Sequence, residues 1–190
     1  MENHPDAQAK ARVQEALCAY RTRVAELASA GRPKPDMVAF SELRKKWLPS
    51  QQTYGHIPGV AIGDVFQGRG ELAIVGLHQN MMTGILTSKD ATRGALAVVL
   101  SGGYADNDDQ GSSVWYTGSG GQKAGHQVQD QVWKGANQAL RQAHLSKAPV
   151  RLIRPSASPV LKGPLCAGSG WRACRASTSL VSRSSTRCAP

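Results

Sequence analysis

Residues 101–121, SGGYADNDDQGSSVWYTGSGG, form the most informative stretch of this sequence. Two tyrosines, Tyr104 and Tyr116, flank a short acidic turn, and glycines lie at both ends of the stretch. Aromatic rings on either side of oxygen acceptors, on a backbone that glycine allows to bend sharply, suit a flat polar ligand such as a nucleobase. The alternative is an acidic surface loop between two strands, and the stretch alone does not decide between the two.

The length of 190 residues and the hydrophobic fraction of 41% are enough for one domain with its own core. The longest apolar runs, such as residues 96–100, are far too short to cross a bilayer, and the N-terminus shows no apolar segment of a secretory signal. The net charge of +10 suggests a polyanionic partner. Seven of these ten charges lie in residues 151–190, which contain no acidic residue, so charge alone does not define a nucleic-acid-binding domain.

Residue types that carry catalysis or bind metals are not clustered in this sequence. The four cysteines show no CxxC pair or metal-ligand spacing, and the five histidines lack a carboxylate or cysteine partner at useful spacing. The glycines at 118–121 are not followed by the Lys-Ser/Thr pair of a phosphate-binding loop. We therefore expect no catalytic residue, no metal site, no cofactor and no structural disulfide.

Three stretches carry helical patterns. Apolar residues recur at spacings of three and four over Ala9–Ala30, which predicts a helix that ends at Gly31. A second helix is predicted over Met37–Trp47, with a proline near its start, and a third over Asp130–Leu145.

Short apolar runs rich in β-branched residues lie between the second and third helices and after the third, and they predict strands. In chain order these are Val60–Phe66, Glu71–His78, Ala95–Ser101, Ser113–Thr117 and Pro149–Arg154, with Gln79–Arg93 as a polar connection. Helices followed by a run of strands and one more helix favour an α+β domain with a curved antiparallel sheet or partial β-barrel. We expect a helical lead-in over residues 1–53, the domain over 54–154, and a basic, low-complexity tail without regular structure over 155–190.

Many segments between Gly55 and Arg154, in order and at fitting spacing, resemble the SRA domain (SET- and RING-associated, also called YDG), whose fold is PUA-like. The segments are Gly55-His56-Ile57-Pro58-Gly59-Val60, Gly63-Asp64-Val65-Phe66, Glu71-Leu72, Val75-Gly76-Leu77-His78, Gly84-Ile85, Ser101-Gly102-Gly103-Tyr104, Tyr116-Thr117-Gly118-Ser119-Gly120-Gly121, Asp130-Gln131, Asn137-Gln138-Ala139-Leu140 and Pro149-Val150-Arg151-Leu152-Ile153-Arg154. The helix upstream is similar to the lead-in of plant-type histone lysine methyltransferases, so the chain resembles that branch most.

The resemblance implies a non-enzymatic nuclear chromatin module that reads methylated cytosine in double-stranded DNA by flipping the base out of the helix. Tyr104 and Tyr116 match the two tyrosines that sandwich the flipped base, and stacking on an aromatic ring contributes about 1–3 kcal/mol per base. Backbone groups at Gly103, Thr117 and Gly118 match those that contact the base edge. Chromatin proteins are possible further partners, whereas a membrane or a small-molecule substrate is not expected.

The chain departs from the family at the base-reading aspartate, whose position is taken by Asn107. An amide oxygen still accepts a hydrogen bond from the cytosine amino group, but it lacks the charge that strengthens the bond. We therefore expect weaker binding or a relaxed choice of base. The neighbouring Asp106 and Asp109 are expected to support the loop rather than to contact the base.

Two loops of the family enter the DNA grooves. Met82, in the first loop, matches the wedge that fills the gap left by the flipped base, although a partly buried loop methionine is an equal alternative. In the second loop, which is short here, Lys123 and His126 are placed to touch phosphates.

A second departure lies after Arg154, where the family continues into a Tyr-Asp-Gly segment and the strands that close the barrel. No Tyr-Asp-Gly occurs in this sequence, and no cysteine-rich cluster or SET domain follows. Three hypotheses stay open: a DNA-binding module, the N-terminal part of a histone lysine methyltransferase with a tail read in an unintended frame, and a degenerate interaction remnant that does not bind DNA.

Overall fold

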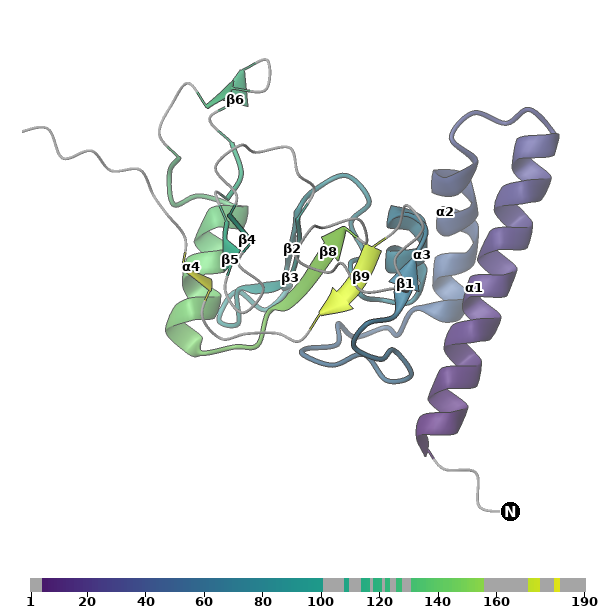
Figure 1. Ribbon diagram of the computed structural model, residues 1–190, viewed down its shortest axis with the longest axis horizontal. Helices are drawn as coiled ribbons and strands as arrows, with labels where there is room; N and C mark the ends of the chain where they lie inside the picture. Colours follow the sequence, from purple (N-terminus) through teal and green to yellow (C-terminus); the bar gives the residue numbers. More distant parts are fainter. Residues whose placement is uncertain are drawn as a thin grey trace, which may run out of the picture.

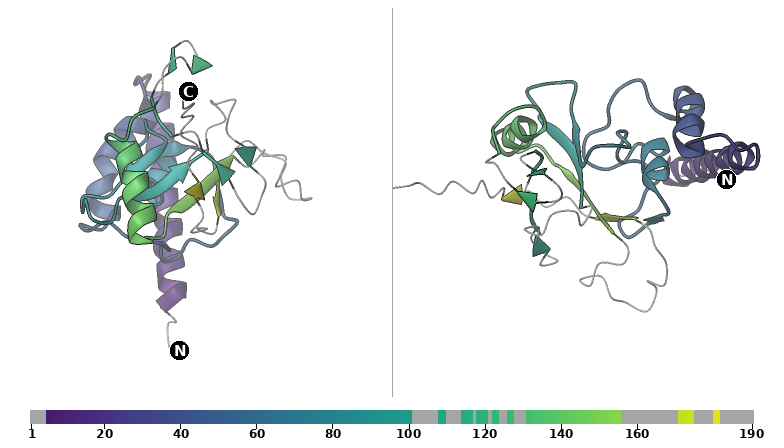
Figure 2. Two further views of the ribbon diagram at one scale, coloured as in Figure 1. Left: turned by 90° about the vertical axis from the view of Figure 1, so that its left-hand side faces the viewer. Right: turned by 90° about the horizontal axis from the view of Figure 1, so that it is seen from above.

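The computed structural model describes residues 5–100, 108–109, 114–116, 118–120, 122–123, 126–127, 131–155, 171–174 and 180–181. These residues form an α+β fold with N-terminal helices, a partly curled sheet and a helix packed against it, which confirms the predicted class. Figures 1 and 2 show the sheet between a pair of helices at one end of the molecule and a single helix at the other.

The pair consists of α1 (Pro5–Ser29) and α2 (Pro35–Trp47), which lie side by side (Figure 1). Both helices were predicted, the first from the spacing of its apolar residues and the second with a proline near its start. Pro35, at the start of α2, has no backbone N–H, so the first turn has one fewer donor that lacks a helical acceptor. The Tyr20 hydroxyl of α1 donates a hydrogen bond of 3.3 Å to the carbonyl of Asp36, which joins α1 to the start of α2.

The main sheet has the strand order β1-β9-β8-β3-β2. Its strands are β1 (Val65–Phe66), β2 (Ile85–Thr87), β3 (Ala95–Val99), β8 (Arg151–Pro155) and β9 (Trp171–Cys174). The pair β3 and β8 is parallel, whereas the other neighbours are antiparallel, so the sheet is mixed and not wholly antiparallel as predicted. A parallel pair needs a long crossover, and here the crossover contains α4 (Ala136–Ser146).

Smaller ladders lie in the crossover between β3 and α4. Strand β4 (Asp108–Asp109) pairs antiparallel with β5 (Val114–Trp115), and β6 (Gln122–Lys123) pairs antiparallel with β7 (His126–Gln127). Strand β10 (Leu180–Val181) lies parallel to β5. The region after residue 154, for which no regular structure was predicted, thus contributes β9 to the main sheet and β10 to the ladder with β5.

Both faces of the main sheet are covered by apolar side chains. Successive residues point to opposite faces, so Val99 and Ile153 pack with the helices α1 to α3, whereas Val98 and Leu152 pack with α4 and β5. Two-sided burial explains why Ala95–Val99 is a continuous apolar run without polar alternation. Tyr116 belongs to the second of these two clusters.

The predicted strand over Glu71–His78 is wrong, because its first part is the helix α3 (Arg69–Ile74). All of residues 70–74 are buried, so the helix shows no polar face, and a short apolar run of this kind does not distinguish a buried helix from a buried strand. The Glu71 carboxylate accepts a hydrogen bond of 2.8 Å from the backbone N–H of Gln67, which stabilises the first turn.

Two further boundaries differ from the prediction. Strand β2 lies inside the predicted polar connection, since its three residues are too few to show a pattern. Helix α4 starts at Ala136 and not at Asp130, because Gly135 has a φ of 57°, outside the range of a right-handed helix. Residues 131–134 therefore lie beside the glycine-rich segment and not in the helix.

Candidate nucleic-acid interface

Three of the predicted DNA-contacting residues, Met82, Tyr116 and Gly118, have described side chains or backbones in this structure. Lys123 and His126 are described only as backbone, and they face each other across the β6–β7 ladder. Gly103, Tyr104, Asn107 and Thr117 lie outside the described residues. Of the two residues predicted to sandwich the base, the described part of the chain thus includes only Tyr116.

Tyr116 follows β5 and has only 4% of its surface exposed. Its ring packs in the cluster that contains Ile85 of β2 and Leu140 of α4. A Cβ atom added at Gly84 would lie 2.8 Å from the Tyr116 hydroxyl oxygen, so only glycine fits at this position without moving the tyrosine. Gly84 also closes the loop that carries Met82, so the loop and the Tyr116 ring meet at this residue.

The glycine-rich segment after Tyr116 is held by the start of α4. Asn137, which is buried, accepts a hydrogen bond of 2.8 Å from the Ser119 backbone N–H and donates one of 2.9 Å to the Ser119 carbonyl. Gly118 has a φ of +85°, and a Cβ atom there would lie 2.6 Å from the Gln131 side-chain oxygen. These contacts fix the backbone conformation of the Gly118–Gly120 segment. Asn137, which belongs to one of the sequence motifs, makes the hydrogen bonds that hold it.

An ion pair fixes the β4–β5 hairpin to the main sheet. Arg154 of β8 donates two hydrogen bonds to the Asp109 carboxylate, Nε to Oδ2 at 2.6 Å and Nη2 to Oδ1 at 2.8 Å. The exposed fractions of the two side chains are 8% and 17%. Asp109 thus supports the hairpin through its carboxylate, in line with the structural role expected from the sequence.

The Asn80–Gly84 loop presents Met82 to solvent. Met82 has 78% of its surface exposed, so the alternative of a partly buried methionine is wrong. The Asn80 side-chain oxygen accepts hydrogen bonds from the backbone N–H groups of Met82 and Thr83, at 2.9 and 3.0 Å. An exposed apolar side chain on a tightly bonded loop has the form of a wedge.

Arg69, at the first position of α3, contacts the backbone of this loop. Its Nη2 atom donates to the carbonyl oxygens of Asn80, at 2.8 Å, and of Thr83. Burial lowers the pKa of Arg69, and the nearby Tyr116 phenol opposes this effect. The sequence did not reveal Arg69, because its contacts lie 11 and 14 residues away and no spacing rule links them.

His78 is fully buried beneath the same loop. Its Nδ1 atom lies 2.8 Å from the Asn80 carbonyl oxygen, and since a carbonyl only accepts, Nδ1 carries the proton. Burial, followed by the neighbouring Arg69 guanidinium, lowers the pKa of His78 to about 4, against the opposing effect of the Asn80 and Gly84 carbonyls. The imidazole is therefore neutral at physiological pH and serves as a packed donor to the loop.

We expect His78 to make the fold sensitive to acid. The folded state holds the imidazole neutral down to a pKa of about 4, whereas the unfolded chain takes up a proton below about pH 6.5. The unfolded state thus binds more protons in this window, and stability falls as the pH falls, by roughly 3 kcal/mol in total. Urea unfolding of the wild type and of His78→Asn at pH 7.5, 6 and 5 checks this. The wild type should lose more stability between pH 6.5 and 5 than the variant, and parallel losses would contradict the assignment.

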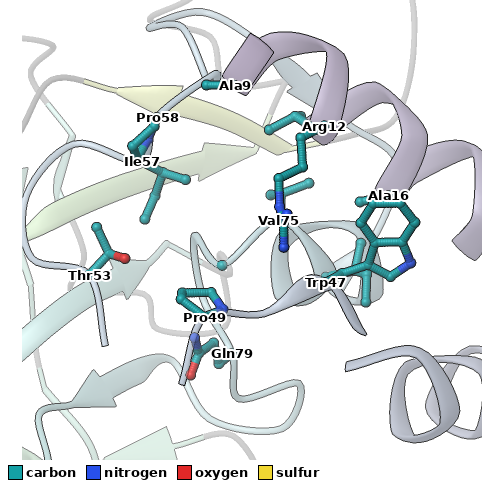
Figure 3. A pocket seen from close by; sticks show the side chains of 13 residues that line it. Ala9, Arg12, Ala16, Trp47, Pro49, Thr53, Ile57, Pro58, Val75 and Gln79 are labelled. Atoms are coloured by element: carbon teal, nitrogen blue, oxygen red, sulfur yellow. The ribbon is translucent and has the colours of Figure 1, made fainter. Parts of the chain in front are cut away.

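A separate cavity of about 290 Å³ lies between the lead-in helices and the rest of the domain. Figure 3 shows it bordered by Arg12 and Ala16 of α1, by Trp47 at the end of α2, and by Ile57 and Val75. Its lining does not include Tyr116, Met82 or the Gly118–Gly120 segment. The cavity is therefore distinct from the candidate base site.

Within the described ranges, no helix combines the length and apolar character that a membrane span needs. Nor does this described part of the chain contain a group of three or more His, Cys, Asp or Glu side chains placed to hold a metal ion. Cys18, on α1, is a free and exposed thiol.

Comparison with known proteins shows the family to which this chain belongs. The model of the SAD/SRA domain matches residues 53–168. This chain belongs to the SAD/SRA domain family. The match continues past Arg154, where the sequence motifs ended, into the region that precedes β9.

Relatives among curated proteins include several plant-type histone lysine methyltransferases. The chain is 36% identical over 154 residues to the H3 lysine-9 specific enzyme SUVH3 of Chlamydomonas reinhardtii, a match over 78% of this chain. It is 43% identical over 106 residues, 53% of this chain, to the family member SUVH9 of Arabidopsis thaliana. The match spans 16% of the length of each of these relatives. The resemblance to this branch is thereby confirmed.

Solved structures show the same fold. A complex of the SUVH5 SRA domain with hemi-methylated CG DNA is 34% identical, has a TM-score of 0.54, and covers 66% of this chain and 77% of that one. KRYPTONITE in complex with mCHG DNA and SAH has a TM-score of 0.77 at 24% identity, over 88% of this chain and 38% of that one, and at this identity it shows the fold alone.

Proposed function

We propose that this chain is a DNA-binding chromatin module that recognises methylated cytosine by base flipping. The observation that carries the proposal is the junction at Gly84, where a loop with an exposed Met82 meets the hydroxyl end of the Tyr116 side chain. A base flipper needs these two parts side by side, because one fills the gap in the duplex while the other stacks on the extruded base. The SUVH5 SRA domain, solved with hemi-methylated CG DNA, supports the proposal by its similarity.

In this proposal Tyr104 and Tyr116 stack on the two faces of the flipped base. Gly103, Asn107, Thr117 and Gly118 contact its edge, while Lys123 and His126 lie along the phosphates. The Gly118–Gly120 segment, which is held by hydrogen bonds to Asn137, supports the assignment of Gly118. The module acts in the nucleus, on double-stranded DNA and beside chromatin proteins.

Within this chain only an SRA domain is found, and the match spans 16% of the length of the related enzyme SUVH3. We propose that the chain itself binds and does not catalyse. The short coverage of the relatives, 16% of their length, favours a second candidate, in which the chain is the N-terminal part of a histone lysine methyltransferase. Sequencing the transcript beyond the Arg154 codon tests this, since cysteine clusters in another frame would support the longer protein.

We expect the whole chain to bind a duplex with one methylated cytosine about four-fold more tightly than the same duplex without the methyl group. This factor follows from about 0.8 kcal/mol for burying one methyl carbon. Fluorescence polarisation with the two labelled duplexes at fixed salt measures the preference, and the fixed salt matters because phosphate contacts depend on it strongly. Equal affinity for both duplexes would contradict the recognition of methylated cytosine, and no binding at all would argue for the degenerate remnant.

A further inference from the structure

We propose that Arg69 is the positioning residue of the proposed base flipping: its guanidinium holds the Asn80–Gly84 loop in the shape that presents Met82 and ties that loop to the Tyr116 side of the pocket. This inference rests on the proposed function, and it adds a residue that neither the motifs nor the comparisons assign.

The contacts of Arg69 bracket the wedge. Its Nη2 atom donates to the carbonyl oxygen of Asn80, two residues before Met82, and to that of Thr83, one residue after it. The Asn80 side chain bonds the backbone N–H groups of Met82 and Thr83 from the other side. One cationic group thus fixes both ends of a short turn, while Met82 projects with 78% of its surface exposed. Hydrogen bonds from a charged donor are stronger than neutral ones, so this clamp is firm.

Arg69 also lies beside the pocket wall. The Tyr116 phenol is close enough to influence the ionisation of the guanidinium. Gly84, the last residue of the loop, leaves no room for a side chain against the Tyr116 hydroxyl. The loop that Arg69 holds is thus in contact with Tyr116 through Gly84.

The backbone of Arg69 is itself anchored from two sides. The next residue but one, Glu71, receives a bidentate ion pair from Arg21 of α1, with distances of 2.7 and 3.1 Å. At Gly70 there is no space for a Cβ atom, because the Tyr20 ring of α1 lies against it. Helix α3 is therefore held in place by the lead-in helix α1, and Arg69 extends from this fixed base to the loop.

A phosphate contact is the competing role for an arginine near DNA. Arg69 is half-buried, and its Nη2 atom already has two carbonyl acceptors in the loop. A positioning role and a phosphate contact differ in their salt dependence, because each phosphate contact adds close to one unit to the slope of log K against log salt.

The test uses the whole chain and a duplex with 2-aminopurine next to the methylated cytosine, since the fluorescence of this base rises when its neighbour leaves the stack. Four variants are compared with the wild type: Arg69→Met, Arg69→Lys, Met82→Gly and the double variant Arg69→Met/Met82→Gly. Arg23→Met is the matched control, because it removes an exposed arginine of α1 that pairs with Glu26 and Glu42 and not with α3 or the loop. Thermal unfolding of each variant confirms that the fold is retained at the temperature of the assay.

We expect Arg69→Met to weaken binding about ten-fold and to abolish the 2-aminopurine signal, with the salt slope unchanged. Arg69→Lys should recover part of the signal, because a single ammonium reaches one carbonyl but not both. The double variant should bind no more weakly than the weaker single variant, since Arg69 acts through the loop that presents Met82. Arg23→Met should leave the signal intact.

Two results would overturn the inference: additive losses in the double variant, or a salt slope that drops by about one unit in Arg69→Met, which would make Arg69 a phosphate contact. If Arg69→Met does not fold, the comparison of Arg69→Lys with the wild type decides, and an undiminished 2-aminopurine signal there counts against the role. A wild-type chain that binds without any 2-aminopurine signal would instead refute base flipping itself, so the two failures are distinguishable.

Discussion

Arg154→Met is expected to lower the free energy of unfolding by about 3–5 kcal/mol, the loss typical of breaking one partner out of a buried ion pair. Arg154 is 6% exposed, and both of its hydrogen bonds to Asp109 are short, at 2.6 and 2.8 Å. The substitution removes the guanidinium that pairs with the Asp109 carboxylate, in a mostly buried place where water screens charges only weakly. It also disconnects the β4–β5 hairpin from β8, because the pair links residues 45 positions apart.

Chemical denaturation of the wild type and the variant measures this loss. The control is Arg23→Met, which breaks an ion pair of similar length, 2.7 Å to Glu42, on the exposed side of α1, and which should leave the midpoint almost unchanged. The double variant Arg154→Met/Asp109→Leu should recover part of the lost stability, since it removes the second charge as well. A loss in Arg154→Met no larger than that in Arg23→Met would show that the pair is not important for stability.

Tyr116→Ala is expected to weaken binding to methylated DNA by about 5- to 150-fold, the range that corresponds to 1–3 kcal/mol for one stacked base. Tyr116→Phe keeps the ring and should bind nearly as well as the wild type. The two variants together separate stacking from the contribution of the hydroxyl. Polarisation titrations with the methylated duplex, at a temperature where both variants are folded, give the affinities.

Because Tyr116 is only 4% exposed, its removal also leaves a cavity in the cluster with Ile85 and Leu140. We expect Tyr116→Ala to be destabilised by about 3–5 kcal/mol, as for other large core residues. Leu140→Ala is the matched control, since it opens a cavity in the same cluster without touching a base in the proposed complex. If Leu140→Ala weakens DNA binding as much as Tyr116→Ala does, the effect of Tyr116 is one of stability and the stacking role is wrong.

Much of the fold could be predicted from local patterns alone. The helices α1 and α2 follow from apolar residues at helical spacing, and Gly31 and Pro35 mark where one ends and the other begins. Strands β3 and β8 follow from buried β-branched runs, although their parallel pairing does not. The order of the glycine and tyrosine motifs was enough to recognise the family, which the match to the SAD/SRA domain confirms.

The predictions were wrong or silent where burial on all sides removed the pattern. Helix α3 was predicted as a strand because its buried residues show no polar face. The one charged residue among them, Glu71, is paired with Arg21 of α1. Strand β9 was not predicted, since its residues Trp171–Cys174 lie in a stretch without a periodic pattern of apolar residues. They form a strand by pairing with β8 and β1.

The sequence by itself thus determined the family, the helical lead-in and the identity of the proposed stacking residues, because these depend on residue type and on spacing along the chain. The tertiary structure decided which side chains support them. The Arg69 contacts to the Met82 loop, the Arg154–Asp109 pair and the Asn137 bonds to Ser119 join residues 11 to 45 positions apart. A hydrogen bond depends on the positions of two groups in space, and only the folded chain brings these donors within reach of their acceptors.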